Sequence, residues 1–117
     1  MSLCAFIEQV KSGKNVSFED TMTIIAQHYY YTPVGFSNGL SDSVIINEAG
    51  KNEGSCKIFA FARLNGLDQQ QTLNLFGDYY RLDVLNNPKA GDHGNIRAFM
   101  RDGWAGIDFK GVALTPK

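Results

Sequence analysis

The chain has 117 residues, of which 44% are hydrophobic and 20% charged, and its formal net charge is -1. This is the composition of one ordinary globular domain, which we place over residues 1–117, and it excludes a disordered or fibrous chain. The near-neutral charge argues against nucleic acid as a partner, and the longest apolar run, residues 58–62, is far shorter than the roughly 20 residues of a membrane span.

The first two predicted helices carry recognisable start and stop signals. Apolar spacing predicts a helix over residues 2–12, which ends at Gly13 because glycine suits a left-handed cap. Ser17, followed three residues later by Asp20, resembles a capping box. It predicts a second helix that ends near Tyr30.

The segment over residues 31–54 is predicted to be mostly loop. Pro33 favours an extended conformation for the residue before it, and several glycines and asparagines follow. Residues 44–46 predict one short strand inside this loop, although a single strand cannot form a sheet alone.

A nearly apolar helix is predicted next, at about residues 55–65. Ser55 is its expected N-cap and Gly66 its stop, and only Lys57 and Arg63 interrupt the apolar residues. A helix that is apolar on all sides belongs at the centre of a domain. A buried strand over residues 58–62 is the competing interpretation.

The last third of the chain predicts two more helices and a tail. Asp68 caps a helix whose apolar spacing continues to Leu85, with a kink or a split at Gly77. Asp92 caps the final helix, and residues 103–117 predict an extended segment across the core.

These elements together predict a mainly α fold. We expect a compact bundle of about five helices around the central apolar helix (about residues 55–65), with a long middle loop and an extended C-terminal tail. An α+β fold with a small sheet is the alternative.

The stretch NEAGKNEGSC, residues 47–56, contains the first candidate for chemistry. Near a helix start, the thiol of Cys56 could be stabilised as a thiolate, with one of the two histidines as its base. The neighbouring carboxylates oppose that thiolate, and free cysteines are commonly small buried residues. We therefore favour a buried Cys56.

Two Asn-Glu pairs in the same stretch admit more than one interpretation. Their oxygens could bind a hard cation, but their spacing matches no calcium loop, and the Cys and His residues lack zinc-ligand spacing. We expect no metal and no other cofactor. The preferred interpretation is that these pairs hydrogen-bond the long loop to the start of the central helix.

Two aromatic clusters, HYYY (residues 28–31) and DYYR (residues 78–81), are the strongest compositional oddity. Tyrosine combines an apolar ring with a hydroxyl group and therefore suits a pocket wall or a protein interface. Asp78 and Arg81 predict a solvated i,i+3 pair, and Trp104 is expected to anchor the tail in the core.

A pocket or binding surface is expected to use residues from all of these motifs. The candidate site residues are Asn47, Glu48, Asn52, Glu53, Cys56, His28, Tyr30, Asp78, Tyr79, Tyr80, Arg81, His93 and Trp104. Their residue types assign no reaction, so the sequence leaves open whether the protein is an enzyme.

The sequence resembles the HopJ family, also called HopPmaJ, of type III secretion effectors over nearly its whole length. The matching stretches are HYYYTPVGFSNG (28–39), NEAGKNEGSCKIFAFARLNGL (47–67), FGDYYR (76–81), DHGNIRAFM (92–100) and GWAGIDFKGVALTPK (103–117). The resemblance implies a small single domain of unestablished biochemical activity that a type III system delivers into a host cell. There it would bind a host or bacterial protein, or a small ligand.

A resident protein of the bacterial cytoplasm is the alternative. The first helix begins almost at the N-terminus and Glu8 is an early acidic residue, whereas type III export signals are flexible and lack early acidic residues. Cys4 and Cys56 read as reduced thiols, which fits the cytosol. Such a protein would not be secreted and would bind or convert a small molecule in a carboxylate, Tyr and His pocket.

Overall fold

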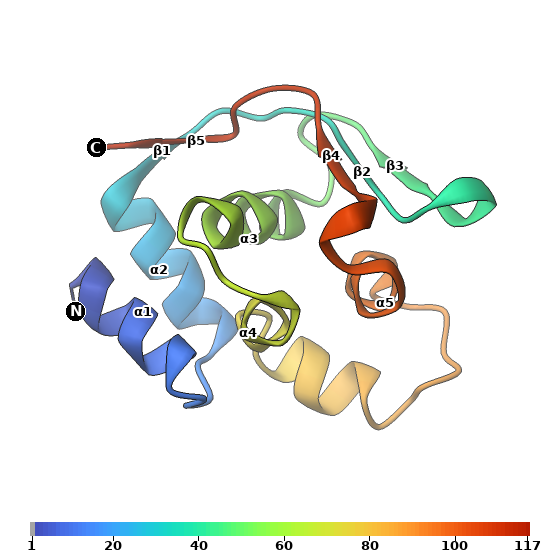
Figure 1. Ribbon diagram of the computed structural model, residues 1–117, viewed down its shortest axis with the longest axis horizontal. Helices are drawn as coiled ribbons and strands as arrows, with labels where there is room; N and C mark the ends of the chain where they lie inside the picture. Colours follow the sequence, from blue (N-terminus) through green and yellow to red (C-terminus); the bar gives the residue numbers. More distant parts are fainter. Residues whose placement is uncertain (1) are drawn as a thin grey trace.

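The computed structural model describes residues 2–117, with helices on one side and short strands along the other (Figure 1). The helices are α1 (Leu3–Lys11), α2 (Phe18–His28), α3 (Glu53–Leu64), α4 (Gln69–Asn74) and α5 (Gly94–Asp102), with a π-helical segment, η2 (Tyr79–Val84), and two 3-10 turns, η1 (Ser41–Ser43) and η3 (Gly103–Gly106). The strands are β1 (Tyr29–Tyr31), β2 (Phe36–Asn38), β3 (Ile45–Asn47), β4 (Ile107–Phe109) and β5 (Leu114–Pro116). Across residues 2–117, every helix is too short or too polar to cross a lipid bilayer.

Helices α1 and α2 start where the sequence predicts. The side chain of Ser2 accepts a hydrogen bond from the backbone N–H of Ala5 (3.1 Å), and that of Ser17 accepts one from Asp20 (3.0 Å). Helix α2 ends at His28, before the predicted end near Tyr30, because the next three residues are extended and pair with β5.

The prediction of a long middle loop is wrong. The segment contains β2, β3 and the last residue of β1, and the predicted strand at residues 44–46 is observed one residue later as β3. Strand β2 lies between β3 and β4 in one antiparallel sheet, and β1 pairs with β5 in another. Each strand has only three residues, so its sequence gives little signal without its partners.

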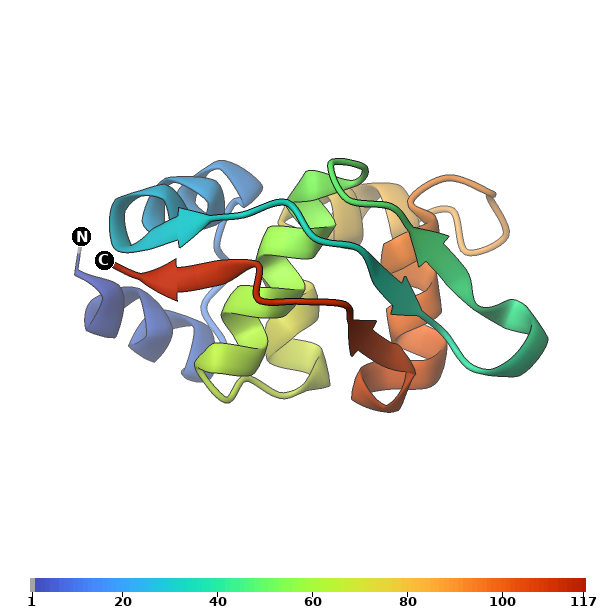
Figure 2. The ribbon, with the colours of Figure 1, turned by 90° about the horizontal axis from the view of Figure 1, so that it is seen from above.

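The C-terminal tail is extended from Ile107 onward, as predicted, whereas residues 103–106, which were also predicted to be extended, form η3. The partner of the extended part is the segment that contains β1 and β2. Between the two sheets, the backbone N–H of Thr32 donates to Ala113 (2.8 Å) and that of Lys110 donates to Gly35 (2.9 Å). The two segments therefore form one long, interrupted antiparallel ribbon, which runs across α3 (Figure 2).

Helix α3 is the buried centre of the domain, so the central-helix prediction is confirmed and the competing strand is wrong. Ile58, Phe59, Phe61 and Ala62 have no exposed surface. The predicted N-cap is wrong, however. The backbone N–H of Cys56 donates to the carbonyl oxygen of Asn52 (3.0 Å), so Asn52 is the N-cap and Ser55 lies within the first turn.

The helix predicted to start after Asp68 is split into α4 and η2, and the split lies at Gly77, as predicted. Asp68 and Gln71 form the capping box of α4, and Gly77 then breaks the helix with a φ angle of 63°. A Cβ atom on Gly77 would lie 2.6 Å from the backbone nitrogen of Phe18. The chain resumes as η2.

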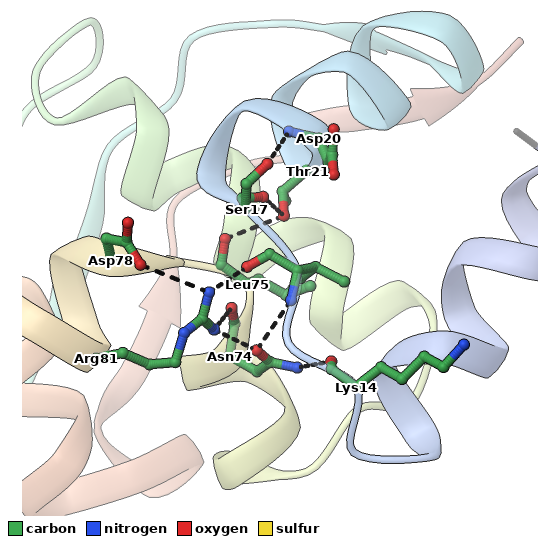
Figure 3. Close-up of polar contacts among 9 residues, drawn as sticks. Lys14, Ser17, Asp20, Thr21, Asn74, Leu75, Asp78 and Arg81 are labelled. Atoms are coloured by element: carbon green, nitrogen blue, oxygen red, sulfur yellow. Dashed lines mark hydrogen bonds and ion pairs between the residues drawn. The ribbon is translucent and has the colours of Figure 1, made fainter.

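Arg81 in η2 forms hydrogen bonds both to α4 and to the turn between α1 and α2 (Figure 3). Its guanidinium donates to Oδ1 of Asn74 (2.6 Å) and to the carbonyl oxygen of Val16 (2.6 Å). The Asn74 amide donates to the carbonyl oxygen of Lys14 (2.7 Å). The predicted Asp78 pair is long, at 3.9 Å, and the Asp78 side chain is 77% exposed.

Helix α5 starts one residue later than predicted. His93 is the N-cap, because Asp92 uses its carboxylate to accept from Arg97 (2.8 Å). Trp104 anchors the tail in the core, as predicted, by packing on Phe99 and donating from Nε1 to the carbonyl oxygen of Leu67 (3.1 Å).

The fold therefore matches the α+β alternative. The helical bundle around α3 is present, but the expected long loop and part of the tail form antiparallel sheets of two and three strands.

Candidate functional site

A cleft of about 330 Å³, with both polar and apolar side chains in its wall, lies between the starts of α3 and α5. The residues that line it are Phe18, Asn52, Gly54, Ser55, Phe76, Tyr79, His93, Gly94, Asn95 and Ile96. They come from four separate parts of the chain, and none of these described lining residues is acidic. The cleft is therefore a product of tertiary structure and has no carboxylate in its wall.

Both helix starts at the cleft lack a side-chain cap. Asn52 and His93 are the N-caps, both in the left-handed conformation (φ 52° and 51°), and neither side chain accepts from its helix. The first intrahelical bonds are donated by Cys56 and Arg97. The N–H groups of residues 53–55 and 94–96 therefore have no acceptor within their helices, and the helix dipoles make this end electropositive.

His93 is held by two carboxylates and one ring. Its Nε2 lies 3.1 Å from Oδ2 of Asp83 and 3.8 Å from Oδ2 of Asp92. The Tyr79 ring packs on the imidazole at a centroid distance of 5.3 Å, and Phe18 packs edge-on to Tyr79 at 5.1 Å. The aromatic wall of the cleft is thus fixed by contacts among its own rings.

Four asparagine side chains, the asparagine cluster (Asn38, Asn47, Asn52 and Asn95), support the cleft. Asn38, Asn47 and Asn95 are buried, with 0%, 2% and 8% of their surface exposed. Oδ1 of Asn47 accepts from Asn52 (2.7 Å) and from Asn95 (2.9 Å). The expected hydrogen bonding between the middle segment and the start of the central helix is therefore observed between Asn47 and Asn52, the two asparagines of residues 47–56.

Cys56 does not line the cleft. Its thiol is 1% exposed and donates to the carbonyl oxygen of Val34 at 3.8 Å. Burial raises the pKa of the Cys56 thiol, so the thiol stays protonated at neutral pH. This environment fits the buried-residue interpretation and opposes a thiolate nucleophile.

Tyr31 lies on the same side of α3 as Cys56. Burial, together with the nearby Cys56 and Glu53, raises the pKa of the Tyr31 hydroxyl well above its ordinary value of 10.0. The hydroxyl oxygen is buried without a hydrogen-bond partner among residues 2–117. The Lys57 ammonium lies over the ring, 4.7 Å from its centroid.

Two of the candidate carboxylates lie away from the cleft lining. Glu48 and Glu53 are exposed and do not line the cleft. Within residues 2–117, no group of three His, Cys, Asp or Glu side chains has the arrangement of a metal site.

The other candidate residues are dispersed. Tyr80 and Arg81 line a second depression, of about 370 Å³, beside α1 and α4. Asp78 is exposed, Tyr30 is 64% exposed on β1, and His28 ends α2. Of the thirteen candidates, the structure brings Asn52, Tyr79 and His93 into the cleft and places Asn47 directly behind it.

Asn95, Phe18 and Phe76 line the cleft, although none of them was a predicted site residue. Asn95 had a usable signal, because it lies four residues before Phe99 and therefore on the buried face of the helix. A polar amide on an apolar helix face needs a buried partner. Phe18 and Phe76 carried no such signal, since both fit an ordinary core.

Comparisons with known proteins agree with one another. A family model described as HopJ type III effector protein matches residues 3–114. A crystal structure titled as that of the unknown function protein VPA0580 superposes with a TM-score of 0.93 and 47% sequence identity, covering 100% of this chain and 95% of that chain. A search of the curated proteins gave no significant match.

Proposed function

The chain belongs to the HopJ type III effector family, and we propose that it acts by binding a small ligand, rich in hydrogen-bond acceptors, in the cleft between α3 and α5. The family has no biochemical activity assigned to it by the comparisons, since the solved relative is itself described as of unknown function. The proposal therefore comes from the site.

The observation that carries the proposal is the convergence of three separated stretches on one cleft. Asn52, Tyr79 and His93 come from residues 47–67, 76–81 and 92–100, each of which carries the resemblance to HopJ proteins. The volume of about 330 Å³ is at the lower end of the range for small-molecule sites.

The chemistry of the wall selects the ligand. Two uncapped helix starts present backbone N–H donors, and Ser55 and Tyr79 add hydroxyl groups. Hydrogen-bond acceptors such as carboxylate or phosphate oxygens match these donors. The nearest carboxylates described above, those of Asp83 and Asp92, contact His93 and are not part of the lining.

The test is an NMR titration of ¹⁵N-labelled protein with acetate and with inorganic phosphate. We expect saturable shifts centred on the backbone amides of Gly54, Ser55, Gly94 and Asn95. Tyr79→Ala should weaken the effect, whereas Tyr30→Ala, an exposed tyrosine on β1 outside the cleft, should not. If the resonances of these four amides do not shift at millimolar ligand, the proposal is refuted.

Protein binding is the second candidate, and the β2–β3 hairpin favours it. Leu40, Val44 and Ile46 are 46%, 39% and 70% exposed on this hairpin. Neighbouring exposed apolar residues are a common feature of protein contact sites. Quantitative crosslinking in host and bacterial extracts should yield a defined partner that Ile46→Lys abolishes and Tyr30→Ala retains.

Delivery into a host cell is the function that the family description suggests for the chain. Export should then require an intact type III apparatus, measured with a translocation reporter fused to the C-terminus. A reporter signal that stays in the bacterium with both intact and defective apparatus would favour the resident cytoplasmic protein.

A further inference from the structure

Asn47 is the common partner of both helix starts at the cleft, although it does not line the cleft itself. Its Oδ1 accepts from the amides of Asn52 (2.7 Å) and Asn95 (2.9 Å), and its own amide donates to Oδ1 of Asn95 (3.1 Å). Asn52 precedes α3 and Asn95 lies in the first turn of α5. One buried side chain thus joins the two helices that form the cleft.

Asn52 does not behave as an ordinary N-cap asparagine. At an N-cap the side-chain oxygen of Asn normally accepts from an N–H two or three residues further on. Asn52 makes no such bond and is held in the left-handed conformation, with its amide nitrogen bound to Asn47. The amide nitrogen of Asn52 is therefore engaged by Asn47, and the Asn52 side chain does not cap α3.

The rest of the asparagine cluster fixes Asn47 in place. Asn95 Oδ1 also accepts from the amide of Asn38 (3.0 Å), and the same amide donates to the carbonyl oxygen of Asn95 (2.8 Å). Asn38 belongs to β2 and Asn47 to β3. The hairpin that carries both residues is consequently connected to both walls of the cleft.

We propose that Asn47 is a positioning residue of the cleft: it withholds Asn52 from the start of α3, so that the N–H groups of residues 53–55 stay free for a ligand. This inference rests on the proposed ligand-binding function for its purpose, but the capping state of α3 can be measured without any ligand.

The first test measures hydrogen exchange at Gly54 and Ser55 in Asn47→Ala. Without its partner, Asn52 can turn to the extended N-cap conformation and accept from one of these amides. We expect the amide that Asn52 then caps to exchange about fivefold more slowly than in the wild type, because an N-cap hydrogen bond contributes about 1 kcal/mol. In the double variant Asn47→Ala/Asn52→Gly, which has no capping side chain, the exchange should return to the wild-type rate. Unchanged or faster exchange in Asn47→Ala would overturn the proposal.

The second test repeats the acetate and phosphate titrations. Asn47→Ala should bind about fivefold more weakly, and the added Asn52→Gly change should recover most of that loss. If Asn47 served stability alone, the double variant would bind no better than the single one. Thr72→Val, which removes a fully buried hydroxyl outside the cleft, is the matched control for lost stability and should bind as the wild type does.

The two tests separate the two proposals. Absent titration in the wild type refutes the proposed ligand, while hydrogen exchange still decides whether Asn47 controls the capping of α3. Should Asn47→Ala fail to fold, Asn47→Ser replaces it, because its shorter side chain keeps a polar group beside Asn95 and loses the reach to Asn52.

Discussion

Gly77 lies between α4 and η2, and its surroundings are the most crowded of any glycine in the chain. Its φ angle of 63° is in the left-handed region, and a Cβ atom there would meet the backbone of Phe18 at 2.6 Å. Backbone atoms cannot move aside as the end of a side chain can. The glycine is therefore required both by conformation and by space, and it brings the start of α2 against the end of α4.

Replacing Gly77 by alanine should lower the free energy of unfolding by about 3 kcal/mol, from left-handed strain and overpacking together. Urea denaturation followed by Trp104 fluorescence measures it. Gly91→Ala is the control, because a Cβ atom there meets nothing within 4 Å, and its effect should stay within about 1 kcal/mol. Equal effects of the two changes would contradict this account of Gly77.

Tyr31 and Cys56 make the stability of the protein sensitive to alkali. Their pKa values are raised, mainly by burial, so the folded protein keeps both protons at a pH where the unfolded chain loses them. Stability is then constant below the ordinary pKa values of 9.0 and 10.0 and falls as the pH rises through and above them.

Tyr31→Phe should flatten the alkaline fall in stability, measured as the free energy of unfolding between about pH 8 and pH 11. At pH 7 the change should be nearly neutral, because the lost hydroxyl is buried without a partner. Tyr30→Phe, at an exposed tyrosine, should keep the wild-type slope. A wild-type slope in Tyr31→Phe would show that this hydroxyl does not control the effect.

At the scale of elements, α4 and α3 show two kinds of helix start. Asp68 and Gln71 satisfy the start of α4 with their own side chains, which is a local device that the sequence displays. Helix α3 starts at Asn52, which is left-handed and whose side chain donates to Asn47 of β3 instead of capping the helix. The Ser55 cap was a reasonable prediction from neighbouring residues, but partners distant in the sequence moved the start.

Asp68→Ala should therefore cost about 1 kcal/mol of stability, while Ser55→Ala should cost less than about 0.5 kcal/mol. Thermal or urea unfolding of the two variants under the same conditions measures both values. A larger loss for Ser55→Ala than for Asp68→Ala would restore Ser55 as the cap.

Arg81 joins η2 to α4 and to the turn before α2 through hydrogen bonds to Asn74 and Val16, and not mainly through its ion pair with Asp78. Replacing it by Met keeps most of its apolar length and removes the hydrogen bonds to Asn74 and Val16, so we expect a loss of about 2 kcal/mol. Asp78→Asn is the control, since this exposed partner at 3.9 Å should contribute less than about 0.5 kcal/mol. Similar losses for both would show that the ion pair is the important contact.

At the scale of the whole molecule, the ribbon joins the middle of the chain to its C-terminal segment. Tyr29 lies opposite Pro116 and Phe36 lies opposite Phe109, so each pairing spans more than seventy residues. The ribbon crosses α3 and carries Leu114, which is 2% exposed, into the core. Strands, central helix and core should therefore unfold together.

Deleting residues 114–117 should lower stability by about 3 kcal/mol or more and keep a single cooperative transition, because β5 and the buried Leu114 are lost together. Circular dichroism and Trp104 fluorescence should give coincident curves. Deleting Lys117 alone removes its hydrogen bonds to His28 and Ala26 and should cost about 1 kcal/mol. Two separate transitions in the longer deletion would show that the ribbon is an independent unit.

The candidate site was predictable in part. Residues 47–56 and the second tyrosine cluster do reach one cleft, through Asn52 and Tyr79, because both flank helices that the sequence predicts. The candidates Glu48, Glu53 and Cys56 do not line the cleft, since residue type alone cannot tell which side chains near the start of α3 face it. Asn95 was predictable from its place on the buried face of α5, four residues before Phe99, but it was not among the candidates.

The sequence by itself determined the helices and the burial of α3, because caps, glycine stops and apolar spacing act within a few residues of the chain. Tertiary structure alone decided the strands and the cleft. Three-residue strands become stable only against partners, and the residues of β4 and β5 lie 69 to 87 positions along the chain from the residues they pair with. The left-handed N-caps at Asn52 and His93 likewise depend on side chains from other elements, so no local pattern could specify them.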